Sequence, residues 1–189
     1  KFFKTELSNV NECREAVLFT KKKFSHVDIL VNAAGLTDRG NIVETSEELF
    51  DQMIGVNVKG PFFLIQDVVK NMIENEIKGS IINIGSQAAI TGQPFLSSYS
   101  LSKGALATLT KNTAFALLKN NIRVNQLNIG WMASDGEHAI QTKFHNAPEN
   151  WLEEAEKKQP FKRLLKTDEV AKAVTFLASS DSGMMTGSV

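Results

Sequence analysis

A short apolar run passes directly into small residues in Val27-Asp28-Ile29-Leu30-Val31-Asn32-Ala33-Ala34-Gly35. A run so short and so rich in Ile and Val is typical of a strand that is buried in a parallel sheet. Two later stretches, residues 80–84 and 122–129, have the same character. The sequence therefore predicts three buried parallel strands, and Phe2-Phe3 is expected to close a fourth strand.

Helical patterns separate the predicted strands. They cover roughly residues 9–24, 46–75 and 98–120, and a last helix is expected to begin near Thr167. Strands that alternate with long helices predict βαβ units, so we expect an α/β fold: a doubly wound parallel sheet in a three-layer α/β/α arrangement. The length of 189 residues fits a single domain over residues 1–189. Residues 131–166 have a looser pattern, which is typical of a lid over a substrate site and also of a packed surface insertion.

The composition is that of an ordinary globular protein, with 42% apolar and 22% charged residues. Lys plus Arg and Asp plus Glu number 21 each, which argues against nucleic acid or an anionic membrane as a partner. The single cysteine, Cys13, excludes an internal disulfide, and the three histidines are not spaced as metal ligands, so no metal site is expected. Neither a signal peptide nor a membrane-spanning run is visible, and a cytoplasmic location is expected.

Small and polar residues follow each predicted strand. The segment Asn32-Ala33-Ala34-Gly35 follows the first strand, Gly85-Ser86-Gln87 follows the second, and Gly130-Trp131-Met132 follows the third. The carboxyl ends of parallel strands meet at one edge of the sheet, and ligands bind at that edge in open α/β sheets. We therefore expect a site there, where small residues let a ligand approach the backbone closely.

Tyr99 and Lys103 lie near the start of the helix that follows the second of these loops. Tyr99 is the only tyrosine in the chain, and a spacing of four residues puts both side chains on one face of a helix. A neighbouring ammonium stabilises a phenolate, which suits a tyrosine that exchanges protons near neutral pH. A tyrosine and a lysine also occur at this spacing by chance, and it is the other motifs at the same edge that favour a catalytic interpretation.

In order as well as content, these motifs resemble the short-chain dehydrogenase/reductase family of the classical type, which has a Rossmann-like fold. The resemblance covers nearly the whole chain and rests on five motifs: Asn32-Ala33-Ala34-Gly35, Asn57, Ser86, Tyr99-Ser100-Leu101-Ser102-Lys103 and Ile129-Gly130. It implies hydride transfer between NAD or NADP and a small alcohol or ketone substrate. In such enzymes the cofactor carries the hydride, and the protein supplies binding, orientation and proton transfer.

The resemblance also implies four catalytic residues. Tyr99 would protonate the carbonyl in reduction or take the hydroxyl proton in oxidation, and Lys103 would stabilise the phenolate and hold the nicotinamide ribose. Ser86 would bind the substrate oxygen and stabilise developing charge. Asn57 would bend its helix and hold a water in a proton relay that reaches Lys103. An asparagine inside a helix costs stability, which favours a functional reason for its presence.

Further residues would hold the cofactor and the substrate. The resemblance places these cofactor contacts, besides Tyr99 and Lys103: Glu6, Leu7, Asn32, Ala33, Ala34 and Gly35 near the adenosine, and Ile129, Gly130, Met132 and Ser134 near the nicotinamide. Three of them depart from the family pattern, since Glu6, Ile129 and Ser134 stand where Asp, Pro and Thr are usual. The expected substrate contacts are Ser86, Gln87, Gln93 and Trp131. These side chains fit a polyol, a sugar-like alcohol or a hydroxy acid equally well.

The glycine-rich turn that normally binds the pyrophosphate is absent, because the chain has 12 glycines but no Gly-x-Gly. The family's first strand, first helix and second strand are expected to precede Lys1, and a last strand is expected to begin near Val189. We therefore expect a fold that is incomplete at both ends and retained from a longer enzyme. The alternative is a non-enzymatic fragment that serves as an oligomerisation or interaction module, and intact mass distinguishes the two.

An epimerase or dehydratase that uses the same Tyr/Lys pair is a third possibility, and net turnover of added cofactor separates it from a dehydrogenase. Association is also expected. The predicted helix over 98–120 carries small residues that allow close helix approach, and in the family this helix and the one over 61–74 form a dimer interface. The resemblance therefore implies a homodimer or homotetramer.

Overall fold

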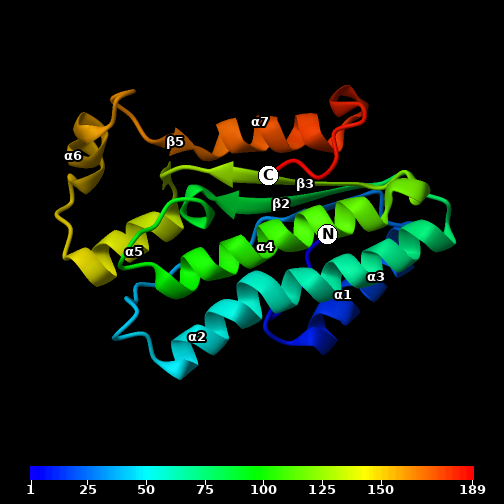
Figure 1. The fold of residues 1–189 in the computed structure, drawn as a ribbon, viewed down its shortest axis with the longest axis horizontal. Helices are drawn as coiled ribbons and strands as arrows, with labels where there is room; N and C mark the ends of the chain where they lie inside the picture. The colour runs from blue at the N-terminus through cyan, green and yellow to red at the C-terminus, as the bar shows by residue number, and fades with distance from the viewer.

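Three parallel strands, in the order β1-β2-β3, form the centre of the computed structural model, which describes residues 1–189 (Figure 1). They are β1 (Ile29–Asn32), β2 (Ser80–Ser86) and β3 (Arg123–Ile129), which confirms the three strands predicted from the sequence. β2 lies between the other two and is buried along almost all of its length, as its run of apolar residues predicts.

Phe2-Phe3 does not form the fourth strand that we expected. Neither residue belongs to a strand, and the Phe2 side chain is 87% exposed. Phe3 stacks instead on Phe19 of the first helix, with a ring-centroid distance of 4.9 Å. Two aromatic residues have a strong strand propensity, but here the tertiary contact with the helix prevails over it.

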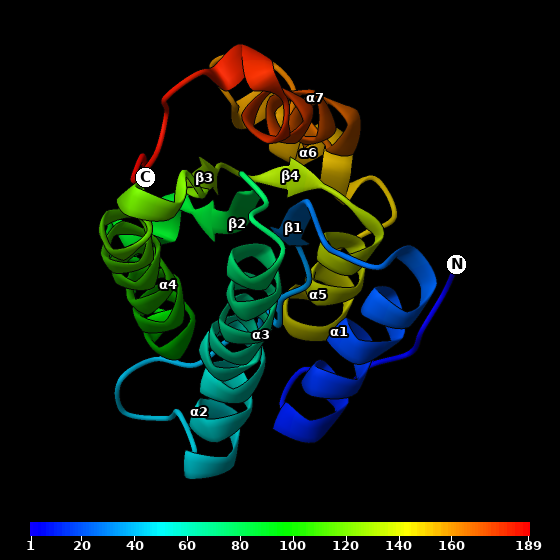
Figure 2. The same cartoon turned by 90° about the vertical axis from the view of Figure 1, so that its right-hand side faces the viewer.

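Helices cover both faces of the sheet, which confirms the three-layer α/β/α architecture (Figure 2). On one face, α4 (Ser97–Ala116) packs against β2 and β3 and α3 (Gly60–Glu74) packs against β1, while α1 (Val10–Phe24) packs against α3. On the other face, α7 (Thr167–Ala178) packs against β2 and β3. No helix combines the length and the apolar character that a membrane span requires.

The single helix predicted over residues 46–75 is divided in two. Ser46 caps α2 (Glu47–Ile54) by accepting a hydrogen bond from the Leu49 N–H, as its position before two acidic residues suggests. A π-helical turn, Gly55–Lys59, then joins α2 to α3. Such turns are rare and are concentrated at functional sites. Asn57 lies in this turn, so the distortion that was expected at Asn57 is present.

Residues 131–166 form the expected excursion of short elements. It contains β4 (Met132–Ala133), α5 (Asp135–His145), α6 (Trp151–Lys158) and β5 (Leu165–Lys166), and β4 pairs with β5 in parallel. In Figure 1, α5 and α6 lie at the end of the molecule toward which the arrows of β2 and β3 point. The excursion therefore stands at the carboxyl edge of the main sheet, where a lid is expected.

The main apolar core lies between the sheet and the helices α1, α3 and α4. Its nine buried residues come from all of these elements: Val17, Ile65, Val68, Met72, Ile81, Ala114, Leu117, Ile122 and Val124. A smaller cluster of Ile82, Ile84 and Leu177 lies under α7. Each fully buried aliphatic side chain contributes about 1.5–3 kcal/mol relative to exposure, so these clusters hold the helices on the sheet.

The last residues of the chain run beside β3. The Gly187 N–H donates to the Val124 oxygen at 2.7 Å, and the Gln126 N–H donates to the Ser188 oxygen at 2.8 Å. This is the start of strand-like pairing on the outer edge of β3, at the place where the sequence predicts that a last strand begins.

Candidate active site

Lys103 and Tyr99 project from one face of α4, the helix that packs on β2. The Lys103 side chain is buried, with 6% of the residue exposed, and its Nζ donates a hydrogen bond to the Ile84 backbone oxygen at 2.9 Å. The same Nζ lies 5.8 Å from the centre of the half-buried Tyr99 ring. Burial lowers the pKa of Lys103 from 10.5 to about 8. The ammonium is therefore still mostly charged at neutral pH, in a place where water is scarce.

The Lys103 ammonium has more N–H groups than its hydrogen bonds to the protein use. It carries three N–H groups, and the bond to Ile84 uses one of them. A Cβ placed on Gly35 would come within 3.3 Å of both Lys103 Nζ and Asn57 Oδ1. Because Gly35 has no side chain, the loop after β1 can lie this close to the lysine and the asparagine. A ligand with hydroxyl groups can approach the free N–H groups at this point.

Asn57 joins the loop after β1 to helix α4. Its residue is 1% exposed, and its Oδ1 accepts from the Leu36 N–H at 2.7 Å. Its Nδ2 donates to the Leu36 oxygen at 2.8 Å and to Ser102 Oγ at 3.0 Å. The amide hydrogens are thus directed at protein atoms, and a relay water of the kind expected here would have to bind to the backbone of the π-helical turn. Ser102 was not singled out from the sequence as a contributor to the site.

Ser86 is the last residue of β2 and pairs in register with Ile129, the last residue of β3. Its Oγ accepts from the Ala88 N–H at 3.1 Å, which fixes the hydroxyl oxygen at the carboxyl edge of the sheet. Gln87 follows on a short 3₁₀ turn, and its Oε1 lies 3.9 Å from where a Cβ on Gly130 would be. The ends of β2 and β3 therefore bring Ser86, Gln87, Ile129 and Gly130 together.

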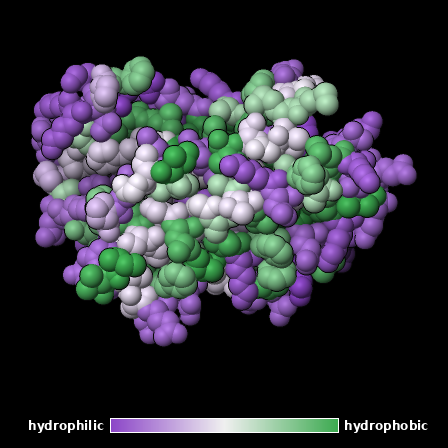
Figure 3. All heavy atoms as spheres, in the orientation of Figure 1, coloured by the Kyte–Doolittle hydropathy of each residue, from purple (hydrophilic) through white to green (hydrophobic).

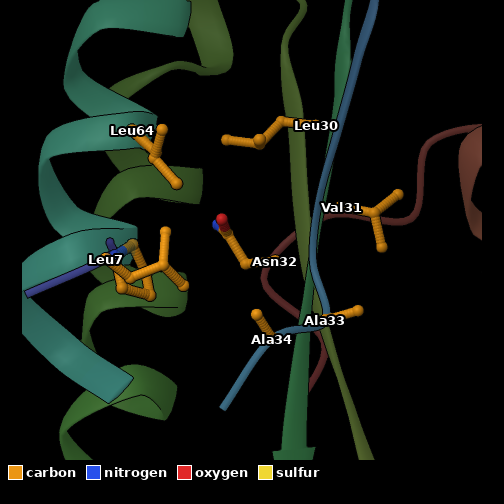
Figure 4. A pocket seen from close by; sticks show the side chains of 8 residues that line it. Leu7, Leu30, Val31, Asn32, Ala33, Ala34 and Leu64 are labelled. Carbon is orange, nitrogen blue, oxygen red and sulfur yellow. The ribbon is translucent and has the colours of Figure 1, made fainter. Parts of the chain in front are cut away.

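A cavity of about 130 Å³ lies at the end of β1, against α3 (Figure 4). Asn32 and Ala34 point into the space that they share with Leu7 and Leu64, whereas Val31 and Ala33 point to the other side of β1. Four of the predicted adenosine contacts thus line one cavity: Leu7, Asn32, Ala33 and Ala34.

The other two predicted adenosine contacts, Glu6 and Gly35, do not line this cavity. Glu6 bonds to Ser8 instead. Its Oε1 accepts from Ser8 Oγ at 2.9 Å and from the Ser8 N–H at 3.1 Å, and these bonds lower the pKa of the Glu6 carboxyl. The carboxylate is exposed and serves the turn that precedes α1.

The residues after β3 lead into the excursion of short elements over residues 131–166. Met132 lies in β4, and Ser134 caps α5 by accepting from the Glu137 N–H at 3.2 Å. Trp131 is 41% exposed, and its Nε1 donates to Glu137 Oε1 at 2.8 Å. Its ring stacks on Trp151 with a centroid distance of 6.4 Å. Gln93, the remaining predicted substrate contact, is exposed in the loop before α4.

One group that the sequence did not indicate connects the excursion over residues 131–166 to the loop after β1. The Arg39 Nη2 lies 3.9 Å from Glu137 Oε1, and both side chains are about 15% exposed. Arg39 also donates from Nε to His145 Nε2 at 3.3 Å and lies over the Phe95 ring. Glu137 and His145 are about a hundred residues from Arg39 in the chain, so no local pattern could have indicated these contacts. No cluster of three or more His, Cys, Asp or Glu side chains converges as a metal site requires.

A buried ammonium lies beside a phenol at the carboxyl edge of a parallel α/β sheet, the edge at which such sheets bind ligands. Comparison with known proteins is more specific. A family model described as enoyl-(acyl carrier protein) reductase matches residues 1–189. An oxidoreductase of Thermotoga maritima is 41% identical over 178 residues, which are 94% of this chain and 70% of the relative. The chain belongs to the short-chain dehydrogenase/reductase family and is an NAD(P)-dependent oxidoreductase.

Other relatives agree with this assignment. A 3-oxoacyl-[acyl-carrier-protein] reductase of Thermotoga maritima is 36% identical and covers 95% of this chain and 70% of its own length. An L-xylulose reductase of Caenorhabditis elegans is 38% identical, with 92% and 68% covered. Among solved structures, NAD⁺-bound xylitol dehydrogenase has a TM-score of 0.87 at 27% identity, covering 98% of this chain and 75% of the other. ElxO with bound NADP has a TM-score of 0.89 at 27% identity, with 100% and 75% covered.

The residues that are present fit parts of both halves of such a cofactor. The buried Lys103 has N–H groups without protein partners, and the exposed, small residues after β1 leave the backbone accessible beside it. The cavity lined by Leu7 and Asn32 adds an apolar surface at the same edge. The glycine-rich turn that would bind the pyrophosphate is not among residues 1–189. The fit therefore concerns the ribose, the nicotinamide and the adenosine surface.

Proposed function

We propose that Tyr99 is the acid and base of this oxidoreductase, and that its substrate is a small polyhydroxylated alcohol or the corresponding ketone. One observation carries the proposal. The Lys103 ammonium is buried, lies next to the Tyr99 ring, and has burial as the only cause of its lowered pKa, so no carboxylate neutralises it. An unneutralised buried cation favours an anion beside it, and the phenolate that forms when Tyr99 gives up its proton is such an anion.

In the proposed mechanism, Tyr99 donates its phenolic proton to the substrate oxygen during reduction and takes it back during oxidation. The Ser86 hydroxyl, fixed at the end of β2, donates a hydrogen bond to the same oxygen and stabilises the charge that develops there. Lys103 stabilises the phenolate and binds the nicotinamide ribose through its free N–H groups. The nicotinamide cofactor, when bound, supplies or accepts the hydride.

Asn57 has a supporting role in this proposal. It holds Leu36 in the loop after β1 and Ser102 on α4, so it fixes the two segments between which the Lys103 side chain lies. The proton that leaves Tyr99 then passes by Lys103 toward solvent through a water held by the backbone of the π-helical turn. We also propose that nine residues at the carboxyl edge contact the cofactor: Leu7, Asn32, Ala33, Ala34, Gly35, Ile129, Gly130, Met132 and Ser134. The Glu6 carboxylate bonds to Ser8, so Glu6 acts at this edge by holding the turn before α1.

The names of the relatives support a polyol or ketose substrate. L-xylulose reductase and xylitol dehydrogenase act, by name, on molecules of this kind. Trp131 supports it as well, because its indole N–H is bound to Glu137 and its ring is backed by Trp151, which leaves an apolar face at the carboxyl edge. An aromatic face with the Gln87 amide near Gly130 suits a molecule that has C–H and O–H groups on its surface, and Gln93 is proposed as a further substrate contact. In this proposal, residues 131–166 close over such a substrate.

A 3-oxoacyl thioester is the second candidate substrate, and the observation that favours it is the 36% identity to the 3-oxoacyl-[acyl-carrier-protein] reductase. The same Tyr99, Lys103 and Ser86 would act on its ketone. The two candidates differ in what they need from the lid. A polyol is enclosed by it, whereas a long acyl chain has to leave through it.

We also propose a homodimer or homotetramer that associates through α3 and α4. The exposed sides of these helices carry large apolar residues, including Phe115 (80% exposed), Phe62 (44%) and Leu101 (52%). Figure 3 shows apolar patches among polar ones on the face of the molecule that includes these helices. Sedimentation that finds only monomers at micromolar concentration would contradict this assembly. The cytoplasmic location expected from the sequence stays a prediction.

The experiment that tests the substrate proposal is a panel of alcohols and ketones, assayed with NAD(H) and with NADP(H). The panel contains pentitols, hexitols, ketoses, hydroxy acids and a short 3-oxoacyl thioester. We expect the highest kcat/KM for a polyol–ketose pair. A clear preference for the thioester would support the second candidate and overturn the first. Transfer of tritium or deuterium from the added cofactor to the product indicates net redox chemistry and distinguishes it from epimerisation.

A further inference from the structure

A row of polar side chains crosses the three strands close to the catalytic edge of the sheet. Asn32 on β1 is the register partner of Asn83 on β2, and Asn83 is the register partner of Gln126 on β3. All three are buried, with 8%, 0% and 4% of the residue exposed. Two residues earlier on β2 and β3, the positions on this face are apolar, and Ile81 and Val124 there belong to the main core.

Thr110 of α4 completes this row. Asn32 Nδ2 donates to Asn83 Oδ1 at 2.8 Å, and Asn83 Nδ2 donates to Thr110 Oγ1 at 2.9 Å. The Thr110 hydroxyl, which is also fully buried, lies 2.9 Å from the Leu106 oxygen and 3.4 Å from Gln126 Oε1. Buried amides and hydroxyls are costly unless they are bonded, so each of these groups holds its neighbour in one position.

The row joins α4 to β2 next to the site. Thr110 follows Lys103 by seven residues, which puts the two on the same face of the helix, two turns apart. Thr110 bonds to the Asn83 side chain, and Lys103 bonds to the backbone oxygen of Ile84, the very next residue of β2. These are two polar attachments of one helix to adjacent residues of one strand. A shift of α4 along β2 would break both.

We propose that Thr110 and Asn83 are positioning residues that set the place of α4 on β2, and with it the place of Lys103 and Tyr99 relative to Ser86. The inference rests on the roles proposed above for Tyr99, Lys103 and Ser86. Neither Thr110 nor Asn83 touches the reacting atoms. Their effect is transmitted by the rigid helix, whose first two turns carry both groups of the acid–base pair.

The groups that face Lys103 make it a sensitive reporter of this position. They are the Ile84 backbone on β2, the Tyr99 ring on α4, Asn57 in the π-helical turn and Gly35 in the loop after β1. No carboxylate is among them, and burial alone lowers the pKa of the ammonium. If α4 loosens and water enters, this pKa moves back toward its ordinary value.

Thr110→Val is the variant that tests the inference, because valine keeps the shape of threonine and removes the hydroxyl. Thr175→Val is its matched control. Thr175 lies on α7, is exposed, and donates to the Ala171 oxygen at 2.9 Å, the same local bond that Thr110 makes to Leu106. Thr110→Ser, which restores the hydroxyl, is the rescue variant.

For Thr110→Val we expect kcat to fall roughly tenfold with KM little changed, since a displacement of an ångström or less already misaligns reacting groups. We expect the NMR titration midpoint of the Lys103 ammonium, which does not depend on turnover, to move upward from about 8. Thr110→Ser should recover most of the kcat and the midpoint, and Thr175→Val should match wild type. A Thr110→Val protein that is less heat-stable but has the wild-type kcat and midpoint would overturn the inference, because the row would then be structural only.

Thr110→Val leaves the Asn83 amide without an acceptor, and this alone can prevent folding. The double variant Asn83→Leu with Thr110→Val removes both partners of this bond and leaves only the Asn32 amide, which is 8% exposed, without its acceptor. It still releases α4 from β2, so the same changes in kcat and in the Lys103 midpoint are expected from it. Unchanged values in the double variant would overturn the inference equally. If wild type turned over no alcohol or ketone, the substrate proposal would fail, while the NMR titration would still decide whether the row positions Lys103.

Discussion

The Lys103 Nζ donates a hydrogen bond to the Ile84 backbone oxygen at 2.9 Å, and through this bond a charged side chain is held inside the molecule. The contact places the ammonium one residue before Gly85 and two before Ser86 on β2. A buried cation without a carboxylate partner lowers stability, and such arrangements are concentrated at functional sites. The buried charge that makes the site reactive therefore also lowers the stability of the folded protein.

Lys103→Met should abolish hydride transfer without destabilising the protein at pH 7. The drop in pKa from 10.5 to about 8 corresponds to about 3 kcal/mol by which folding disfavours the charged lysine. Methionine removes this penalty, and the loss of the donor to Ile84 offsets about 1–3 kcal/mol of the gain. Denaturant unfolding of both proteins at pH 7 measures the difference.

The same variant has a pH signature. Below pH 8 the lysine is charged in both the folded and the unfolded protein, so its penalty is fully present. Between about 8 and 10.5 the unfolded state binds more protons than the folded state, so the stability of wild type rises relative to Lys103→Met. A stability difference that stays constant across this window would contradict the assignment. Lys111→Met, at an exposed position of α4, is the control for loss of a lysine.

Gly85→Ala should destabilise the protein by about 1–3 kcal/mol, the usual cost of overpacking a core. A Cβ at this position would lie 2.1 Å from Asn128 Oδ1 and 2.3 Å from Gln126 Nε2, which are bonded to each other at 2.7 Å. Neither side chain can move aside without breaking that bond. Gly92→Ala is the control, since nothing lies within 4 Å of its added Cβ. Equal melting temperatures for the two variants would show that the Gln126–Asn128 pair yields easily.

Asn57→Ala should cost about 1–3 kcal/mol of stability, because it leaves the half-buried Leu36 N–H and oxygen without their partner. It should also lower kcat, since the loop after β1 and α4 lose the side chain that joins them. Asn112→Ala, at an exposed position of α4, removes an asparagine without these contacts. Thermal unfolding and steady-state kinetics of both variants give the comparison. If kcat were unchanged in a destabilised Asn57→Ala, the residue would be structural alone.

Glu137→Ala should raise the KM for substrate several-fold with a smaller change in kcat, the signature of lost binding that is common to ground state and transition state. The substitution removes the acceptor of Trp131 and the carboxylate that faces Arg39. Glu137→Gln keeps the acceptor and removes only the charge, so its KM should stay closer to wild type. An equal defect in Glu137→Gln and Glu137→Ala would mean that the ion pair with Arg39, and not the placement of Trp131, is what substrate binding requires.

The strands and most helices could be predicted from the sequence, because their signals are local. The alternation of apolar runs with helical periods gave β1, β2 and β3 and the boundaries of α1 and α7 within a few residues. The strand predicted at Phe2-Phe3 was wrong because the contact of Phe3 with Phe19 is set by tertiary packing. The π-helical turn at Gly55–Lys59 was foreseen only as a bend, since no propensity distinguishes it from an α-helix.

The site divides in the same way. Tyr99, Lys103 and Ser86 follow from spacing and strand order, which place them at one edge. The contributions of Ser102, Arg39 and Thr110 depend on partners that are 45, 98 and 27 residues away, Asn57, Glu137 and Asn83. Asn83 did leave a signal, as an amide inside the apolar run Ile81-Ile82-Asn83-Ile84. A polar residue in a strand that is buried on both faces needs a partner, and the sequence alone does not say which one.

Hydride transfer by Tyr99→Phe tests the central claim most directly, because phenylalanine keeps the ring beside Lys103 and removes only the hydroxyl. With a substrate from the panel, we predict that kcat falls by roughly 10²–10⁴, the usual contribution of a positioned acid or base. Binding of the reduced cofactor, followed by its fluorescence, should stay close to wild type. Hydride transfer at the wild-type rate in Tyr99→Phe would contradict the account.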